Sequence, residues 1–388
     1  MGKIDDLIKE LCPDGVEWKT IEETCDILDS QRKPISKSKR KSGTFPYYGA
    51  NGIQDWVDGY IFDGTYILMG EDGSVINKDN TPVLNWVSGK IWVNNHAHIL
   101  KEGNNQVDLR FIYYILQTVD VSGIVRGVPP KINQANLKGI TIPLPPLSIQ
   151  QQIVEILDTF TDSISNLQEE LELREKQMEY YRENLLSFDG EDVEYVSFGQ
   201  SFHLKARIGW QGLTKQEYRN QGLYKLVTGT DFTDNHRINF SKCVYVDKER
   251  FDQDKNIQLK EDDILITKDG TLGKVAYIDK LPCPTTLNGG VFVVRNITGE
   301  LNQRFTMHFL ASSKFKRWID SNHTSGSIKH LTQKLFVKFQ IPVPSLSRQQ
   351  EIVDILDTFE SMIANIKEEI ELRQKQYEYY REKLLTFD

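Results

Sequence analysis

Two long stretches of the chain place apolar residues at alternating steps of four and three positions, with polar residues between them. This is the spacing of a helix that buries one stripe of its surface against a partner helix. The stripes run through residues 153–188 and 352–387. Because each continues for about five heptads, it predicts a long coiled-coil helix rather than a short amphipathic one. The predicted seam consists of Ile153, Leu157, Phe160, Ile164, Leu167 and Leu171 in the first helix, and Ile352, Leu356, Phe359, Ile363, Ile366 and Ile370 in the second.

The two helical stretches are near-copies of one another. Residues 143–189 and 342–388 align without a gap at an offset of 199 positions, and 31 of the 47 aligned pairs are identical. Fainter matches precede each copy: ILMGEDGSV resembles ILITKDGTL, and GVEWKTI resembles DVEYVSF. A repeat of this length predicts two similar structural units. We therefore divide the chain into four parts, in the order domain, helix, domain, helix: residues 1–142, 143–189, 190–341 and 342–388.

The connection between the helices predicts how they pair. Residues 190–341 leave the end of the first helix and return to the start of the second, so a compact domain there brings these two ends together and makes the helices antiparallel. The proline-rich PLPPLS and PVPSLS precede the helices, and Ser148 and Ser347 are the expected N-caps. Arg174 and Arg373 interrupt the two seams at equivalent places. Each either extends past the seam to water or pairs with a carboxylate of the partner helix and fixes the register.

The remaining two parts have the pattern of mixed domains in which strands dominate. Segments such as WVDGYIFDGTYILMG and GGVFVVR are rich in β-branched and aromatic residues and are punctuated by Gly, Asp and Asn, which is typical of strands. Residues 108–119 and 305–319 have helical spacing. The predicted fold class is α+β: two β-rich mixed globular domains separated by two long antiparallel coiled-coil helices, in a pseudo-two-fold internal repeat.

Composition excludes several classes of protein. The chain has 388 residues, of which 39% are hydrophobic, and no apolar run approaches the roughly 20 residues that span a bilayer. The N-terminal segment lacks the basic start and apolar stretch of a signal peptide. The four cysteines have neither CxxC spacing nor the density of a disulfide scaffold. We therefore expect a cytoplasmic protein with reduced thiols and no membrane partner.

The net charge of −8 is unevenly distributed. The two helical copies hold 9 basic and 20 acidic residues, a net charge of −11, so the rest of the chain has a net charge of +3. The acidity therefore belongs to the helices, and the globular parts are available to an anionic partner such as double-stranded DNA.

Basic, amide and aromatic residues cluster in a few glycine-containing segments of the globular parts. Such side chains contact phosphates, stack on bases or hydrogen-bond to base edges, although loops of this composition are also common as solvated turns. In the first domain the candidates are Arg32, Lys33, Lys37, Lys39, Arg40, Lys41, Tyr48 and Asn51. In the second domain they are Lys205, Arg207, Trp210, Gln211, Lys268, Lys274, Ser327, Lys329 and His330.

Signals of catalysis are weak. The sequence contains no GxxxxGK[ST], GxGxxG, GxSxG or HExxH motif. Asp14 and Glu17 superficially match a nuclease core but are three positions apart, whereas that core needs a turn and a separate strand between its carboxylates. His96 and His98 could share one strand face and bind a metal, but no matching further ligands are evident, so paired histidines without a metal are favoured. We expect no catalytic residue and no metal site.

The whole chain resembles the specificity subunit of Type I restriction–modification systems. Both helical copies open with the pattern P-x-P-x-L-S-x-Q-Q-x-I-V-x-I-L-D, and each follows a Gly…Gln…Ile-Pro lead-in. The stretch CPDGVEWKTI is similar to the usual opening of that family, and YGANGIQDWVDGYIFDGTYILMGEDGS is similar to one common type of its target-recognition domain.

The resemblance implies a function that the residues alone do not give. Each globular domain would be a target-recognition domain that reads one half of an asymmetric, bipartite DNA target. The helices would set the spacer and dock two modification subunits, which bind S-adenosylmethionine and methylate adenine. Restriction subunits, where present, would use ATP and Mg²⁺. This chain would carry no cofactor and no catalytic residue.

Two other classes of function stay open on the residues alone. One is a coiled-coil scaffold with protein-only partners, and the other is a stand-alone DNA methyltransferase or nuclease. The acidic helices suit a protein contact better than DNA. Four apolar residues beside the seam either form exposed docking positions or belong to a broad intramolecular core: Val154, Ile156, Leu173 and Leu186.

Overall fold

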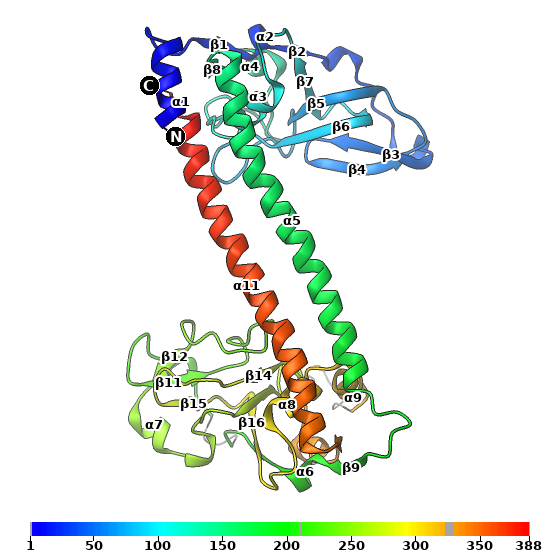
Figure 1. Ribbon diagram of the computed structural model, residues 1–388, viewed down its shortest axis with the longest axis vertical. Coiled ribbons are helices and arrows are strands. Elements are labelled where there is room, and N and C mark those ends of the chain that lie inside the picture. Colours follow the sequence, from blue (N-terminus) through cyan, green and yellow to red (C-terminus); the bar gives the residue numbers. More distant parts are fainter. Residues whose placement is uncertain (1, 209–211, 323–329, 388) are drawn as a thin grey trace. The chain divides into compact units, whose positions relative to one another are not determined.

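The computed structural model describes residues 2–208, 212–322 and 330–387, and it contains two compact units. The first unit comprises residues 1–167 and 369–388, and the second comprises residues 168–368. Each unit holds one globular domain together with part of both long helices, α5 (Leu147–Leu185) and α11 (Leu346–Leu385) (Figure 1). None of the helices in these described ranges is both long enough and apolar enough to cross a membrane.

The globular domain of the first unit is built on a six-stranded sheet with the order β2-β7-β5-β6-β3-β4. All neighbouring strands are antiparallel except β3 and β6, which are parallel. The strands are β2 (Cys25–Ile27), β3 (Ser42–Gly49), β4 (Gly52–Val57), β5 (Phe62–Gly70), β6 (Leu84–Val93) and β7 (Ala97–Glu102), and a separate pair joins β1 (Trp18–Thr20) to β8 (Thr141–Pro143). The helices are α1 (Gly2–Leu11), α2 (Ile21–Thr24), α3 (Leu109–Leu116) and α4 (Gln134–Lys138), with 3₁₀ turns at Asp29–Gln31 and Lys37–Lys39.

The globular domain of the second unit has smaller sheets. Their orders are β10-β16-β13-β14, β12-β11-β15 and β17-β9. The strands are β9 (Glu194–Ser197), β10 (Phe202–Lys205), β11 (Tyr224–Val227), β12 (Val244–Val246), β13 (Ile264–Thr267), β14 (Val275–Tyr277), β15 (Thr285–Leu287), β16 (Val291–Asn296) and β17 (Gln340–Val343). The helices are α6 (Phe198–Ser201), α7 (Lys248–Asp252), α8 (Gln303–Leu310), α9 (Ser313–Ser321) and α10 (Gln333–Phe336), with 3₁₀ turns at Lys215–Glu217 and Lys255–Ile257.

A continuous buried run in a central strand explains how each domain forms its core. Side chains alternate between the two faces of a strand, so a continuous apolar run supplies both faces at once. In β5, Ile67 and Met69 join the core that contains α3, while Leu68 joins a second core on the opposite face. In β13, Ile264 and Ile266 likewise face one core, and Leu265 faces the other. The matching sequences ILMG and ILIT therefore occupy the same structural place in the two units.

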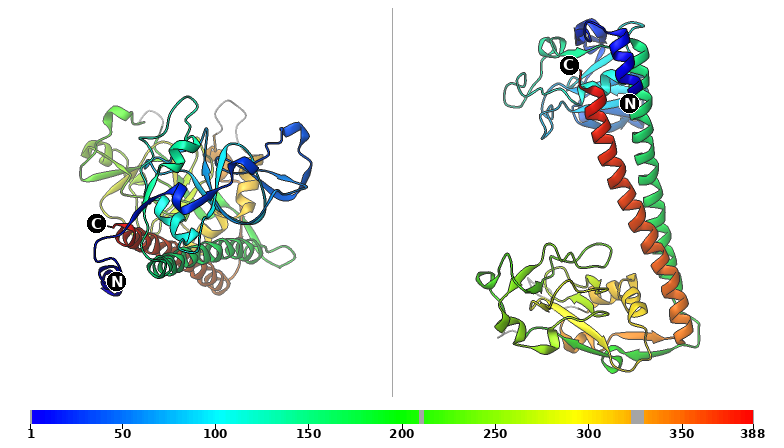
Figure 2. Two further views of the ribbon diagram at one scale, coloured as in Figure 1. Left: turned by 90° about the horizontal axis from the view of Figure 1, so that it is seen from above. Right: turned by 60° about the vertical axis from the view of Figure 1, so that its left-hand side comes forward.

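The long helices are antiparallel in each unit, as the sequence predicts. In the first unit Phe160 of α5 stacks on Tyr380 of α11, with ring centroids 5.1 Å apart. In the second unit the equivalent residues have exchanged helices, because Tyr181 of α5 stacks on Phe359 of α11 at 5.2 Å. Both views in Figure 2 place the two helices side by side. The predicted seam positions are all buried or half-buried.

The two arginines at the seam bond to their own helices. Arg174 contacts Glu170 and Gln177, and Arg373 contacts Glu369 and Gln376. These are contacts between neighbouring helical turns, and they fit the expectation that each arginine extends past the seam. The described ion pair that crosses from α11 to α5 joins instead Lys367 and Glu175, at 2.8 Å.

Each domain is attached to its long helix by the same set of polar contacts. Near the start of α5, the amide of Gln150 bonds to the backbone of residues 106 and 108 just before α3, and Gln349 of α11 does the same just before α8. Two turns later, Asp158 accepts from Arg110 of α3 at 2.8 Å, and Asp357 accepts from Arg304 of α8 at 2.9 Å. The repeated glutamine and aspartate thus fix a domain to the helix, which the helical pattern alone did not indicate.

One expectation about the helices is wrong. Ser148 and Ser347 lie inside the first turn rather than at the N-cap, because α5 and α11 each begin at the residue before that serine. Of the two alternatives for Leu186, the structure supports the intramolecular core, since its side chain is fully buried in the second unit. Val154 and Ile156 are half-buried against the core of the first unit, whereas Leu173 is 65% exposed.

Replacing Asp357 with alanine should destabilise the second domain by about 2 kcal/mol, because the buried His308 loses its acceptor and Arg304 loses one of its two carboxylates. Hydrogen exchange of the full chain should show lost protection in α8 with α3 unchanged. Asp158→Ala should give the mirror result, and Asp354→Ala, which removes an exposed carboxylate, is the control. Equal losses in both domains would contradict the proposed anchor.

Candidate nucleic-acid interface

The basic segment of the first domain contains exposed lysines and arginines that bond to other groups of the domain. It spans residues 32–41 and leads into β3. Lys33, Lys37, Lys39 and Lys41 are exposed. The Arg32 side chain, in contrast, is 13% exposed, bonds to the backbone oxygens of residues 29 and 97, and pairs with Glu71. Its guanidinium is therefore not available to a phosphate, and we leave Arg32 out of the interface.

Arg40 shapes the segment rather than extending from it. Its guanidinium lies 4.2 Å from the centroid of the buried Tyr47 ring, donates to the Ile35 carbonyl at 3.0 Å and pairs with Asp55 at 3.1 Å. A planar guanidinium favours this combination of stacking and fork-like bonding, which an ammonium cannot reproduce. Arg40 is thus a positioning residue for the lysines on either side of it.

Polar and aromatic side chains continue the surface beyond the lysines. Tyr48 is half-buried in β3, where burial raises its pKa, and Asn51 is exposed in the turn between β3 and β4. Trp56 of β4 is 51% exposed, and Lys90 lies over the ring of Tyr60 at 4.7 Å. The sequence analysis missed Trp56 and Tyr60, although tryptophan in a polar, basic neighbourhood is a signal that could have identified them.

The second domain contributes fewer available cations than expected. Lys205 and Lys274 are exposed. Lys268 pairs with Asp269 at 3.0 Å, and the Nδ1 atom of His330 lies 2.6 Å from the same carboxylate. Four further candidates, Trp210, Gln211, Ser327 and Lys329, lie outside the described residues.

Arg207 is also excluded from the interface. It is only 3% exposed, and its guanidinium bonds to the Leu287 and Arg250 carbonyls and to the side chains of Gln253 and Thr286. Burial lowers its pKa, and the nearby Arg250 charge lowers it further. These bonds join β15 to the segment around α7, so Arg207 stabilises the domain instead of contacting a ligand.

The two histidines proposed as a metal pair have different partners. His96 is half-exposed and pairs with Asp72. His98 is fully buried: its Nδ1 atom lies 2.6 Å from Asp29 and its Nε2 atom 2.9 Å from the carbonyl of residue 132. They therefore do not converge on one site.

Around His98 the described residues form a buried charged cluster, which we define as Asp29, Arg32, Glu71, His98 and Lys131. Ligand atoms of Asp29, Glu71 and His98 lie within 4.8 Å of one another, a spacing that a metal ion could use. However, Arg32 and Lys131 already pair with the carboxylates. Burial alone would raise the pKa values of Asp29 and Glu71, but hydrogen bonds from His98, Arg32 and Lys131 outweigh it and hold both below their usual range. We assign the cluster a structural role.

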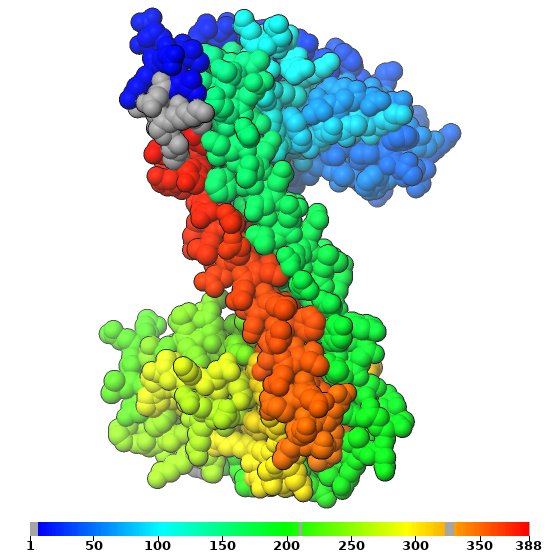
Figure 3. All heavy atoms as spheres, in the orientation of Figure 1, coloured from blue at the N-terminus to red at the C-terminus, as the bar shows by residue number. Residues whose placement is uncertain are grey.

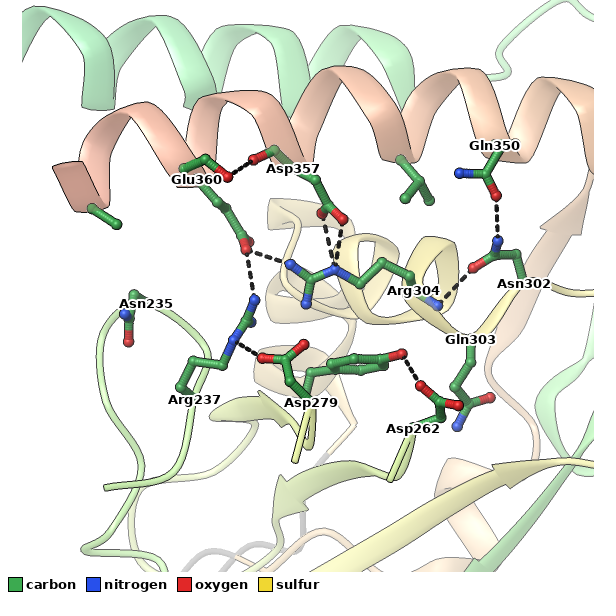
Figure 4. Close-up of a pocket in the computed structure, with 14 residues that line it drawn as sticks. Asn235, Arg237, Asp262, Asp279, Asn302, Gln303, Arg304, Gln350, Asp357 and Glu360 are labelled. Carbon is green, nitrogen blue, oxygen red and sulfur yellow. Dashed lines mark hydrogen bonds and ion pairs between the residues drawn. The ribbon is translucent and has the colours of Figure 1, made fainter. Parts of the chain in front are cut away.

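A polar cavity of about 780 Å³ lies between the second domain and α11 (Figure 4). Arg304 reaches across it to Asp357 and Glu360, and Arg237 reaches Glu360 from the opposite wall. Asp279 and Asp262 face the cavity from the strand side. In the first unit the equivalent Arg110 lies 4.8 Å from the ring of Trp86 and 5.2 Å from that of Tyr113, and Arg304 lies 4.8 Å from the ring of Tyr277.

Two histidines beside this cavity are neutral. Burial, reinforced by the Arg182 charge, lowers the pKa of His236 to about 4. Burial also lowers the pKa of His308, although its bond to Asp357 opposes the shift. His236 has a φ of 58°, in the left-handed region, so its backbone is held in a conformation that non-glycine residues rarely adopt.

Known proteins match nearly the whole chain. Residues 13–174 and 191–372 match the family described as Type I restriction modification DNA specificity domain. A putative type I restriction enzyme specificity subunit from Haemophilus influenzae is 35% identical over 394 residues, covering 96% of each chain. A type I restriction enzyme specificity subunit from Escherichia coli is 29% identical and covers 100% of this chain and 98% of its own.

Solved structures agree on the fold. The S subunit of a Type I restriction–modification system from M. genitalium superposes with a TM-score of 0.67 at 17% identity, covering 96% of both chains. A structure from work on complex assembly and conformational transition of the type I system superposes with a TM-score of 0.57 at 15% identity, covering 96% of this chain and 98% of that one.

The lowered pKa of His236 predicts that the stability of the second domain depends on pH. Its pKa is lowered on folding, so its contribution to stability is complete above the unfolded value of about 6.5 and falls as the pH drops toward 4. At pH 5 the loss should be about 2 kcal/mol, measured by denaturant unfolding of the full chain. His236→Asn, which tolerates the positive φ, should flatten this dependence between pH 7 and 5. An unchanged slope would show that folding does not lower the pKa of His236.

Replacing Lys37, Lys39 and Lys41 together with alanine should weaken binding to every DNA sequence and reduce the salt slope by up to about 2 to 3, since each lost phosphate contact removes about 0.9. Binding titrations of the assembled complex at several salt concentrations would measure this. Replacing Lys176, Lys375 and Lys383, which are exposed on the long helices, removes the same charge and is the matched control. A slope that the helix variant changes equally would refute the assignment.

Proposed function

Because this chain belongs to the family of Type I restriction–modification DNA specificity subunits, the non-catalytic subunits that recognise DNA, we propose that its two globular domains each read one half of a bipartite target. The contacts that fix domain to helix support this proposal most directly. Asp158 and Asp357 hold the domains through equivalent arginines, whereas the surfaces that the domains expose differ. Equivalent attachment with different loops is suited to two half-sites of different sequence, so the target should be asymmetric.

We further propose that the exposed lysines of the first domain hold the DNA backbone, with Tyr48, Asn51, Trp56 and Tyr60 close to the bases. Lysine contacts to phosphate supply affinity and register without sequence information, and polar or aromatic side chains read base edges. In the second domain Lys205 and Lys274 are two exposed cations that would take the same role.

The outer faces of the long helices support a docking role. Leu173 and Tyr180 of α5 are each 65% exposed, and they lie seven positions apart, on one face of the helix. Their equivalents on α11, Leu372 and Tyr379, are 47% and 58% exposed. In Figure 3 the surfaces of α5 and α11 that face the viewer are not covered by the globular domains. We name Leu173 with Tyr180 the first docking patch and Leu372 with Tyr379 the second.

We propose that each patch binds one modification subunit, so that one chain recruits two. Large exposed apolar side chains are unfavourable in water and indicate a protein contact, and two equivalent patches fit two copies of one partner. In this arrangement the partners supply S-adenosylmethionine chemistry, and restriction subunits supply ATP- and Mg²⁺-dependent steps. This chain supplies the target sequence and its spacing. A scaffold with protein-only partners would use the same patches but would leave the lysine surface without a ligand.

Co-expression with the modification subunit should place methyladenine at a bipartite, asymmetric motif, mapped across the genome. Exchanging residues 190–341 for another recognition domain should change one half of that motif and leave the other intact. A change in both halves, or no sequence preference from a complex that is assembled and active, would overturn the proposed reading of half-sites.

Replacing Leu173 and Tyr180 with aspartate should reduce the number of bound modification subunits from two to one, because buried charge at a protein interface is strongly unfavourable. Leu372→Asp with Tyr379→Asp should have the same effect, and the four changes together should abolish assembly. Native mass spectrometry of the purified complex counts the subunits. Glu172→Gln with Glu371→Gln, which alters neighbouring exposed positions, should preserve both.

A further inference from the structure

A short hairpin of the first domain carries an apolar tip that none of the proposed contacts uses. We call residues 126–131, with the sequence Arg-Gly-Val-Pro-Pro-Lys, the finger. Two backbone bonds close its base, from the Arg126 amide to the Lys131 carbonyl at 2.9 Å and from the Lys131 amide to the Arg126 carbonyl at 2.8 Å. Val128 at the tip is fully exposed, at 101% of its reference area.

Val128 is the unusual residue at this tip. Turn tips favour Gly, Pro, Asn, Asp and Ser, so the two prolines fit a turn whereas Val128 does not. All of residues 126–131 are exposed. Single exposed apolar residues are common on protein surfaces, but covering the Val128 side chain with a ligand would remove its apolar area from water, which is favourable.

The finger is held firmly to the domain. The Gly73 amide bonds to the Pro130 carbonyl at 2.9 Å, and the Ile132 amide bonds to the Glu71 carbonyl at 2.9 Å. Lys131 pairs with the Glu71 carboxylate at 3.1 Å, and buried His98 bonds to the Ile132 carbonyl. The buried charged cluster therefore anchors the base of the finger. Proline rings restrict the tip itself, so little conformational entropy remains to be lost on binding.

Together these features fit a rigid wedge for DNA. Proteins that unstack base pairs insert an apolar side chain between them, commonly Phe, Leu, Ile, Met or Pro. Flanking cations hold the adjacent phosphates. Arg126 and Lys131 flank the tip of the finger on both sides. Lys131 pairs with Glu71, but its side chain is 47% exposed and, unlike that of Arg32, can still reach a phosphate. An apolar protein partner would not require these flanking cations, and the docking patches on the helices already offer equivalent sites for the modification subunits.

We propose that the finger inserts Val128 into the base stack of the half-site read by the first domain. This inference rests on the proposed DNA recognition and adds to it one residue that unstacks a base step. The aligned residues of the second domain read Ser-Gly-Ser-Ile-Lys-His, with Ser327 opposite Val128 in the alignment. Val128 should therefore unstack a base step only in the half-site read by the first domain. The other half-site is an internal control.

The experiment uses the assembled complex, its mapped target and the variant Val128→Ala. Affinity for the target should fall about tenfold, because the energy of unstacking is no longer offset. The salt slope should stay unchanged, since no phosphate contact is lost, whereas Arg126→Gln should lower it. Leu11→Ala, which truncates another exposed apolar side chain of the same unit, should bind like wild type.

A second measurement identifies the wedge itself. 2-Aminopurine placed at successive positions should report one unstacked step in the first half-site that Val128→Ala abolishes, with signals in the second half-site unchanged. A mismatch at that step should restore most of the lost affinity, because the base is already unstacked. Unchanged affinity and fluorescence, or a deficit that persists on mismatched DNA, would overturn the wedge. Sequence-specific binding by wild type in the same titration tests the proposed function separately.

Discussion

A carboxylate on each long helix determines where its globular domain lies. Asp158 and Asp357 occur in the same LDTF sequence, and each accepts from an arginine on the first turn of a short domain helix. Because the helices carry the repeat and the arginines come from otherwise divergent domains, this pair is the point at which a variable part joins a constant part. Removing one partner would leave a half-buried charge without compensation, which strongly constrains both positions.

The same joint is built differently in the two units. In the first, the rings of Trp86 and Tyr113 lie against Arg110, whose ion pair with Asp158 stays partly exposed. In the second, Glu360 and Arg237 extend the pair into a charged network around a cavity, beside two histidines that burial keeps neutral. Aromatic packing is insensitive to pH and salt, whereas a charged network is not. The attachment of the second domain therefore responds more to solution conditions than that of the first.

Charge has two separate roles in the recognition domains. Three arginines use their guanidinium groups for contacts within the domains: Arg32, Arg40 and Arg207. A guanidinium suits this role because it can bond to several oxygens in one plane and stack on a ring at the same time. The lysines of the same segment stay exposed, because a compact ammonium is strongly hydrated and gains little from burial. A basic sequence thus overstates the number of cations that a phosphate can reach, and the arginines serve to position the lysines.

Sequence by itself determined the architecture: the 199-residue offset, the heptad stripes and the order of the parts predict two antiparallel helices and two mixed domains. These features are readable because periodicity and duplication are properties of neighbouring or aligned positions. The residues of the candidate DNA interface could not be predicted from the sequence in the same way. Whether Leu186 is buried, whether Arg207 faces solvent and whether Asp29 lies beside His98 depend on contacts across tens of residues. Only the packed tertiary structure brings such groups together, because burial and hydrogen-bond pairing are decided by neighbours in space, not in the chain.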